Sequence, residues 1–362
     1  MAHPLNGADM AVLARVLREA GGRVPAARLL PIRAAILGRL PFTLLEKALT
    51  AALVPPLAAL PPPLFILGHW RSGTTHLVNL LGLGDFAYVP PVAVGMPWEM
   101  LTLGRLLRPL LERALPEGRF IDQVAVTPTS PQEDEIAIAN MSAISFYHGI
   151  YFPAALDRFV RRGLFFDGAT RADIAEWTEA FALFTRKISW AAGRKPPLVK
   201  NPVYTGRAAL LKALMPRAKF VHIHRDPWAV FLSMRNFWTK LFTALALQPF
   251  AHVDIDELVL STYVRMMTAF DEQTRGWTAP DFVEVAYADL DARPLETVAR
   301  IYATLELPGF AEVRPKMAAY LEGVRSYEKN RFPDDPDAVA KVAARWAPWI
   351  ERWGYRLPAP AA

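Results

Sequence analysis

The sequence predicts an α/β fold: a P-loop-like, three-layer α/β/α arrangement with a central, mostly parallel sheet and a helical insertion. Two observations lead to this fold class. Short apolar strands alternate with helices from residue 64 onward, the order that builds a parallel sheet covered on both faces. The first strand, "LFILG" at 64–68, runs into a glycine turn and then a helix, which is the context of a phosphate-binding loop.

The composition is that of a folded protein with a large core. Of the 362 residues, 52% are hydrophobic and 21% are charged, so one large domain or two modest ones are expected rather than wholesale disorder. The net charge of +6 and the pI near 9.5 favour an anionic partner, which could be a nucleotide, a nucleic acid or a membrane surface. Cysteine is absent, which excludes disulfides and thiolate metal sites.

Residues 1–60 are expected to form a helical N-terminal segment, with breaks at Pro25, Pro31 and Pro41. The chain start has neither the basic nor the apolar stretch of a secretory signal. The uncharged run at 48–68 is interrupted by five prolines, so we do not expect it to span a membrane.

Residues 61–325 are predicted to form the α/β domain. Within it, the mainly helical stretch 100–190 is expected to be an insertion, or lid, over a substrate site. Residues 326–362 are predicted to be a C-terminal tail that packs on the domain.

The later elements follow in order. Strands are predicted at 197–202, 219–227 and 282–290, and each is followed by a helix. Asp226 is expected to cap the helix at 227–238, with Pro227 in its first turn.

The first glycine loop reads "GHWRSGTT". Gly68 and Gly73 keep the spacing of a Walker-type loop, but Thr74 replaces its lysine and the nearest cation is Arg71. Backbone N–H groups of Gly73, Thr74 and Thr75 at a helix start would form a cradle for an anion, and Arg71 would add a charged fork. The alternative is a simple glycine turn with a solvated arginine.

A second candidate anion site follows the strand at 219–227. Arg225 ends this strand, and Ser233 lies about two turns into the next helix, so both side chains could face one phosphate. The alternative is an ordinary strand-end arginine and a serine that bonds within its own helix.

Together the two units resemble the sulfotransferases that use 3′-phosphoadenosine 5′-phosphosulfate, especially bacterial members related to the tyrosylprotein branch. "GHWRSGTT" is similar to their 5′-phosphosulfate loop, and "HRDPWAVFLS" to their 3′-phosphate motif. The resemblance implies that Arg71, Ser72 and the Gly73–Thr75 backbone bind the 5′-phosphosulfate. It implies that Arg225 and Ser233 bind the 3′-phosphate.

The same resemblance suggests roles for two more residues. "VKNPVYTGR" is similar to the segment in which a lysine stands beside the bridging oxygen of the leaving group, the position of Lys200. "VAYADL" is similar to a later family segment, which implies that Tyr287 lies near the nucleotide. The alternative for Lys200 is a surface cation at the end of a strand.

Sulfuryl transfer to a hydroxyl requires a general base within hydrogen-bond reach. Glu133 in "TSPQEDEIAIAN" is our first choice, Glu99 the second and His148 the third. Acidic residues at a helix start also stabilise the helix dipole without any catalytic purpose, so the assignment stays open.

The remaining histidines are expected to be structural. His222 and His224 lie on one face of a strand, His69 and His76 flank the loop, and His76 could stack on adenine. Histidines and carboxylates nowhere show the spacing of metal ligands, so no metal is predicted.

The sequence leaves two other functions open: an ATP-dependent small-molecule kinase, and a non-catalytic nucleotide- or membrane-binding protein. No basic tract with interleaved aromatic residues indicates nucleic-acid binding. For a sulfotransferase, we expect a small-molecule or lipid alcohol as acceptor, a cytoplasmic location and peripheral membrane contact. The acceptor's identity, the oligomeric state and the part of the tail that completes the 3′-phosphate site stay open.

Overall fold

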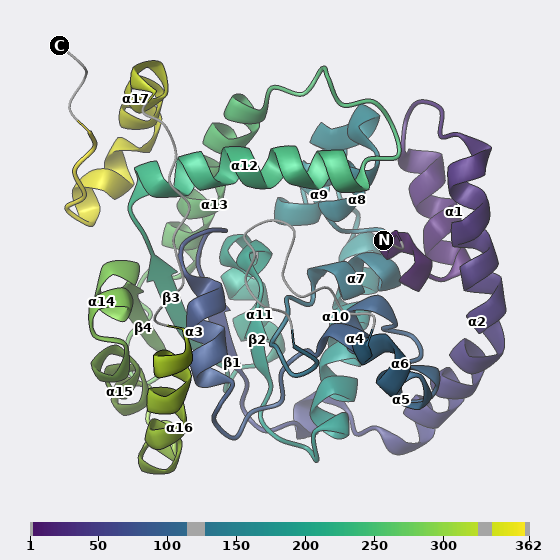
Figure 1. Ribbon diagram of the computed structural model, residues 1–362, viewed down its shortest axis with the longest axis horizontal. Helices are drawn as coiled ribbons and strands as arrows, with labels where there is room; N and C mark the ends of the chain where they lie inside the picture. The colour runs from purple at the N-terminus through teal and green to yellow at the C-terminus, as the bar shows by residue number, and fades with distance from the viewer. Residues whose placement is uncertain (1–2, 114–126, 325–334, 359–362) are drawn as a thin grey trace. The chain divides into compact units, whose positions relative to one another are not determined.

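The computed structural model describes residues 3–113, 127–324 and 335–358 (Figure 1). The chain forms two compact units. The first contains Met1–Pro63, Phe86–Asn201 and Leu241–Val253, and the second contains Leu64–Asp85, Pro202–Lys240 and Asp254–Ala362.

The second unit is built on parallel strands. Strand β1 (Leu64–Leu67) pairs with β3 (Lys219–His224), and β3 pairs with β4 (Phe282–Ala286). In this register Leu64 lies opposite Lys219, and Phe220 lies opposite Phe282. All four residues of β1 are buried, as expected for a parallel strand covered on both faces.

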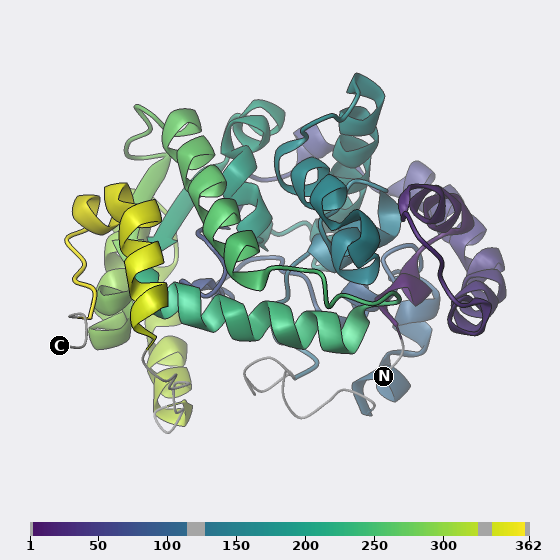
Figure 2. The ribbon, with the colours of Figure 1, turned by 90° about the horizontal axis from the view of Figure 1, so that it is seen from above.

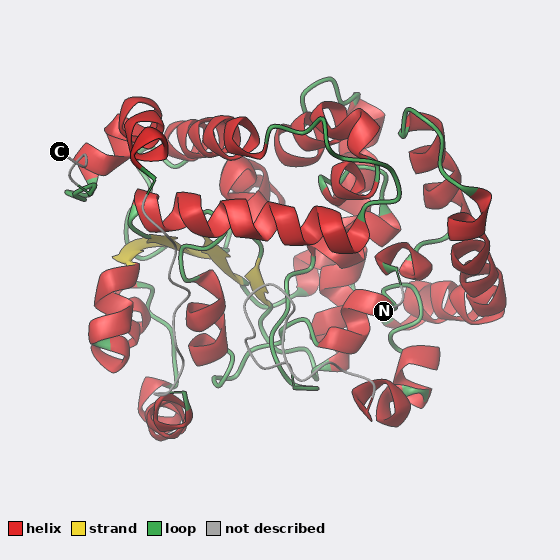
Figure 3. Cartoon of the chain, turned by 45° about the horizontal axis from the view of Figure 1, so that its top comes forward, coloured by secondary structure: helices red, strands yellow, loops and turns green. Residues whose placement is uncertain are grey.

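Helices cover both faces of these strands. Figures 1 and 3 show the strands between α12 and α13 on one side and α3, α14 and α15 on the other. On the α13 side, the ring of His222 in β3 stacks on Phe270 with 4.0 Å between ring centroids. The helices of this unit are α3 (Thr74–Leu81), α11 (Ala208–Leu214), α12 (Pro227–Leu245), α13 (Ile255–Gln273), α14 (Tyr287–Ala292), α15 (Pro294–Thr304), α16 (Phe310–Gly323) and α17 (Pro336–Arg352), with the 3-10 helix η4 (Pro202–Arg207). The last five residues of α12 belong to the first unit.

The first unit is mainly helical, and one strand, β2 (Leu198–Lys200), ends it. Its core is rich in aromatic residues: Trp177 and Phe181 stack at 5.4 Å. Its helices are α1 (Met10–Glu19), α2 (Ala26–Leu53), α4 (Pro91–Gly95), α5 (Leu103–Leu106), α6 (Arg108–Arg113), α7 (Glu135–Met141), α8 (Tyr147–Tyr151), α9 (Leu156–Phe165) and α10 (Arg171–Ala191), with 3-10 helices η1 (Pro4–Gly7), η2 (Leu57–Ala59) and η3 (Pro153–Ala155).

The α/β class and the parallel sheet flanked by helices are confirmed. The cap is also as predicted: the Asp226 carboxylate accepts from the Trp228 N–H at 3.0 Å at the start of α12. The domain boundaries inferred from the sequence remain predictions. Part of the predicted C-terminal tail, at 326–334 and 359–362, lies outside the described residues.

Two sequence-based expectations about elements were wrong. Pro31 and Pro41 do not break the N-terminal helix; both lie inside α2. Each removes one backbone hydrogen bond, and the helix continues because residues on either side of Pro41, such as Ile36 and Glu46, are buried. The strand predicted at 282–290 ends at Ala286, and α14 begins at Tyr287.

The part of the chain that the structure describes contains no helix long and apolar enough to cross a membrane.

Candidate functional site

The glycine loop joins β1 to α3 in the second unit. Its first glycine, Gly68, donates its N–H to the hydroxyl of Thr205 at 2.8 Å. A side chain at Gly68 would meet the carbonyl oxygen of Ile223 at 2.4 Å, so only glycine lets the loop approach β3 this closely. Ser72 closes the turn, because its hydroxyl donates to the carbonyl of His69 at 2.6 Å.

The second glycine of the loop lies close against an aromatic ring. Gly73 has φ of 100°, and a Cβ there would lie 2.2 Å from the Tyr287 ring. Immediately after it, Thr74 begins α3. The loop therefore presents the first N–H groups of a helix, the kind of backbone that binds anions.

Four predicted site residues from separate parts of the sequence meet in the second unit. Arg71 donates from Nε to the hydroxyl of Ser233 at 2.7 Å. Arg225 donates to the backbone carbonyl of Arg71 at 3.1 Å, and its guanidinium lies 4.5 Å from the centre of the Tyr287 ring. Two cations, a hydroxyl and an aromatic face thus adjoin the loop.

The other two predicted catalytic residues pair in the first unit. The Lys200 ammonium at the end of β2 lies 2.6 Å from Oε1 of Glu133, two residues before α7. The Lys200 side chain is 1% exposed and that of Glu133 is 25% exposed. Lys200 is therefore not a surface cation, and the Glu133 carboxylate is the member of the pair that reaches solvent.

The acidic residues that follow Glu133 are held in place. The Asn201 amide donates to Asp134 at 2.8 Å and to Glu135 at 3.0 Å, and Ser145 donates to Glu135 at 2.6 Å. Asp134 and Glu135 are buried. These contacts fix the chain around Glu133.

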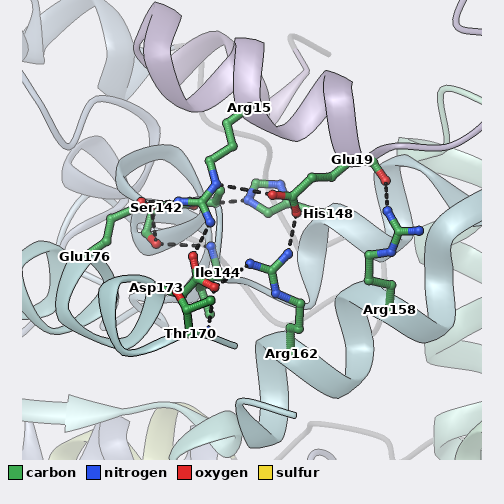
Figure 4. Close-up of polar contacts among 11 residues, drawn as sticks. Arg15, Glu19, Ser142, Ile144, His148, Arg158, Arg162, Thr170, Asp173 and Glu176 are labelled. Carbon is green, nitrogen blue, oxygen red and sulfur yellow. Dashed lines mark hydrogen bonds and ion pairs between the residues drawn. The ribbon is translucent and has the colours of Figure 1, made fainter. Parts of the chain in front are cut away.

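The alternative bases are buried in structural networks. The Glu99 carboxylate accepts hydrogen bonds from Arg39 and Thr43, with none of its side chain exposed. His148 is buried beside Ser142, whose carbonyl lies 3.1 Å from its Nε2, and burial lowers its pKa to about 4. Figure 4 shows His148 within a polar network in which Glu19 of α1 pairs with both Arg15 of α1 and Arg162 of α9.

The loop-flanking and strand histidines are packed against other rings. Burial lowers the pKa of His69 to about 4. In β3, Nδ1 of His222 lies 2.8 Å from the Glu284 carboxylate, while the ring of His224 stacks on Trp353 at 4.3 Å. The ring of His76 stacks on Tyr320 at 6.4 Å.

Two features of the loop were missed at the sequence level. Thr205 was not singled out, although it lies in the quoted segment "VKNPVYTGR". Tyr287 was expected near a nucleotide, but its contact with Gly73 was not foreseen. Both contacts join residues more than 130 positions apart, and no local spacing reveals such a pairing.

Comparison with known proteins identifies the family. Residues 62–312 match the family model described as "Sulfotransferase family". The chain belongs to the sulfotransferase family. This membership makes the protein a sulfotransferase and decides against the kinase and the non-catalytic alternatives.

Relatives of this sulfotransferase occur in mycobacteria. It is 30% identical over 302 residues to omega-hydroxy-beta-dihydromenaquinone-9 sulfotransferase Stf3 of Mycobacterium bovis and of Mycobacterium tuberculosis, which covers 83% of this chain and 77% of theirs. The structure of sulfotransferase STF9 from Mycobacterium avium matches with a TM-score of 0.72 at 18% identity, over 99% of this chain and 93% of that one. Sulfotransferase STF1 from Mycobacterium tuberculosis matches with a TM-score of 0.60 at 20% identity, over 88% of each chain. These two structures share the fold.

Family membership implies 3′-phosphoadenosine 5′-phosphosulfate as the sulfuryl donor. The second unit suits such an anion, because Gly68 and Gly73 leave no room for side chains and two arginines adjoin the loop. Among the described residues, no three His, Asp or Glu side chains form a group that could hold a metal ion.

Proposed function

We propose that this sulfotransferase transfers the sulfuryl group of 3′-phosphoadenosine 5′-phosphosulfate to a hydroxyl of an amphipathic or lipidic alcohol, without a metal ion. The observation that carries the donor assignment is the meeting of Arg71, Ser233, Arg225 and Tyr287 at the glycine loop. The lipidic acceptor is suggested by the mycobacterial relatives, which are named for a hydroxylated menaquinone. We further propose that the enzyme works in the cytoplasm, in contact with a membrane, without nucleic acid as a partner.

In this proposal the loop binds the donor's phosphosulfate end. The N–H groups of Gly73, Thr74 and Thr75 at the start of α3 bind its oxygen atoms, with Ser72 holding the turn, and Arg71 neutralises their charge. Arg225 and Ser233 bind the 3′-phosphate. The Tyr287 ring holds the Arg225 guanidinium in place.

In this proposal Glu133 and Lys200 are the residues that assist sulfuryl transfer to the acceptor hydroxyl. When bound, the donor supplies a sulfuryl group and a phosphate leaving group. Glu133 takes the proton of the acceptor hydroxyl, and Lys200 stabilises negative charge on the bridging oxygen.

The ion pair links these two roles. While Glu133 is ionised, its charge compensates that of Lys200 at 2.6 Å. Once Glu133 is protonated, the Lys200 charge is no longer balanced by it and is fully available to the leaving group. Glu133 is preferred as base over Glu99 and His148 because those two are buried and already hydrogen-bonded.

Calorimetric binding of 3′,5′-adenosine bisphosphate, with magnesium–ATP as the competing ligand, tests the donor assignment. Arg71→Ala and Arg225→Ala should each weaken bisphosphate binding by about 10- to 100-fold, because each removes a charge-assisted contact. Arg293→Ala, whose side chain is 63% exposed, is the control and should leave binding unchanged. Preference for magnesium–ATP, or equal binding by all the variants, would refute the donor assignment.

A double-mutant cycle tests the Glu133–Lys200 pair. Glu133→Gln should lower kcat by about 100-fold or more while bisphosphate binding stays within a fewfold of wild type. Lys200→Met should also lower kcat. The double variant should lose less than the product of the single effects, because the roles are linked. A Glu133→Gln enzyme that turns over normally but binds the bisphosphate weakly would show that Glu133 is not the base.

A further inference from the structure

The C-terminal half of α2 turns a polar face inward and an apolar face outward. Its buried residues are Thr43, Glu46 and Thr50, exposed by 5% or less. Glu46 accepts hydrogen bonds from the backbone N–H groups of Leu101 and Thr102 and forms an ion pair with Lys187. In an ordinary surface helix the apolar residues face the core and the polar residues face water, so this arrangement is inverted.

The outward face of this helix is almost free of polar side chains. Between Leu37 and Leu53, Lys47 is the only exposed residue with a polar side chain. Leu37, Leu44 and Leu53 are 56%, 59% and 56% exposed. The exposed residues, here called the α2 outer face, are Leu37, Gly38, Leu40, Pro41, Leu44, Leu45, Lys47, Ala48, Leu49, Ala51, Ala52 and Leu53.

Leucine in such numbers on one exposed helix face indicates a binding surface. Scattered exposed apolar residues are normal, whereas contiguous ones mark contact with a partner or a membrane. Figure 1 draws α2 at the right-hand edge of the view, with α1 beside it, and α1 and α2 pack together within the first unit. Figure 2 shows the same pair in purple.

The charges of α2 favour an anionic lipid surface over a second copy of the helix as its partner. Glu46 is the only acidic residue of this helix and it is buried, whereas Arg28, Arg33 and Lys47 are exposed. Every exposed charge on α2 is therefore positive. Lys47 pairs with the Asp9 carboxylate at 3.4 Å, so Arg28 and Arg33 contribute most of the positive charge. Two copies of α2 laid face to face would bring these like charges together, while an anionic lipid surface would attract them.

We propose that the α2 outer face binds the interfacial layer of a membrane that contains anionic phospholipids. The helix lies in the plane of the membrane, its leucines among the acyl chains and its cations at the headgroups. It does not cross the membrane, in keeping with the hydropathy of the described helices. This inference deepens the proposed lipid acceptor, but it rests on the composition of α2 and needs no turnover to test.

Vesicle co-sedimentation tests the proposal. The full-length protein should bind phosphatidylcholine vesicles that contain phosphatidylglycerol, and bind vesicles of phosphatidylcholine alone more weakly. Leu37→Glu/Leu44→Glu should weaken binding by about 100-fold or more, because two leucines leave the acyl layer and two negative charges face the lipid. Arg33→Glu should weaken binding mainly to the anionic vesicles.

Ala172→Glu/Ala175→Glu is the matched control. Both alanines are exposed on α10 in the same unit, so this variant adds the same charge without changing any residue of the α2 outer face and should bind like wild type. Bisphosphate binding by each variant, measured in the absence of lipid, reports whether the fold and the nucleotide site are intact.

Three results would overturn the proposal. The first is a wild-type protein that does not bind anionic vesicles. The second is a Leu37→Glu/Leu44→Glu variant that binds them as well as wild type does. The third is a wild-type dimer that this variant converts to a monomer without any vesicle binding, because a second copy would then cover the α2 outer face. None of these results would bear on the proposed donor, which the calorimetric experiment tests separately.

Discussion

At Gly73 the backbone and its surroundings both require glycine. Its φ of 100° is one that other residues rarely adopt, and a Cβ would clash with the Tyr287 ring at 2.2 Å. Tyr287 also stacks against Arg225. A side chain at Gly73 would therefore disturb an arginine that is far from it in the sequence.

We expect Gly73→Ala to weaken binding of 3′,5′-adenosine bisphosphate by about tenfold or more and to lower the free energy of unfolding by about 1–3 kcal/mol. Gly276 is the matched control, because its φ is 82° but no atom lies within 4 Å of a Cβ placed there. Gly276→Ala should lower the free energy of unfolding only by the cost of its backbone strain, and it should leave bisphosphate binding unchanged. Equal effects of the two substitutions on binding would show that the Tyr287 contact is unimportant.

At the scale of elements, a buried ion pair attaches α2 to α10. The Glu46 carboxylate lies 2.5 Å from the Lys187 ammonium, and both side chains are almost wholly buried. Burial lowers the pKa of Lys187, and the Glu46 charge opposes that shift. Because Glu46 also accepts from two backbone N–H groups next to α5, it joins three helices.

Glu46→Gln should therefore destabilise the protein by about 3 kcal/mol, because it removes the carboxylate that pairs directly with the buried Lys187 ammonium. Urea unfolding would measure the loss. Glu179→Gln, on the exposed side of α10, should change stability by less than about 0.5 kcal/mol. A loss no larger for Glu46→Gln than for the control would mean that the pair contributes little to stability.

At the scale of the whole molecule, buried neutral histidines make stability depend on pH. Burial lowers the pKa of His69 and of His148 to about 4 each, against an ordinary value near 6.5. Above pH 6.5 both rings are neutral in the folded and unfolded states. Below it the unfolded chain binds protons that the folded protein does not, so stability falls as the pH falls from 6.5 toward 4.

Each of these two histidines should remove about 2 kcal/mol of stability between pH 7.5 and pH 5. His148 suits the test because it lies in the helical first unit and is not among the residues proposed to bind the donor. Urea unfolding of wild type and His148→Gln at the two pH values should show that the variant loses about 2 kcal/mol less than wild type. An unchanged pH dependence would mean that His148 is already protonated in the folded state or remains accessible to water.

Several features of this protein were predictable because they are local. The strand at 64–67, the glycine turn and the helix from Thr74 follow from residues next to one another in the chain. The Asp226 cap was predictable for the same reason. Pro31 and Pro41 predict helix breaks that do not occur. Burial on both sides of Pro41 in α2 outweighs the loss of backbone hydrogen bonds.

Short-range patterns of apolar, glycine and charged residues are enough to predict the α/β class, the two anion-binding motifs and the resemblance that led to the sulfotransferase family. Three other features depend on the folded chain: Arg71 donates to Ser233, Lys200 pairs with Glu133, and the leucines of α2 face outward. A contact between distant residues depends on how the whole chain packs. The spacing of apolar residues in α2 does not predict which face is buried, because the buried face is polar. Glu46 lies on that face, where it accepts from two backbone N–H groups and pairs with Lys187.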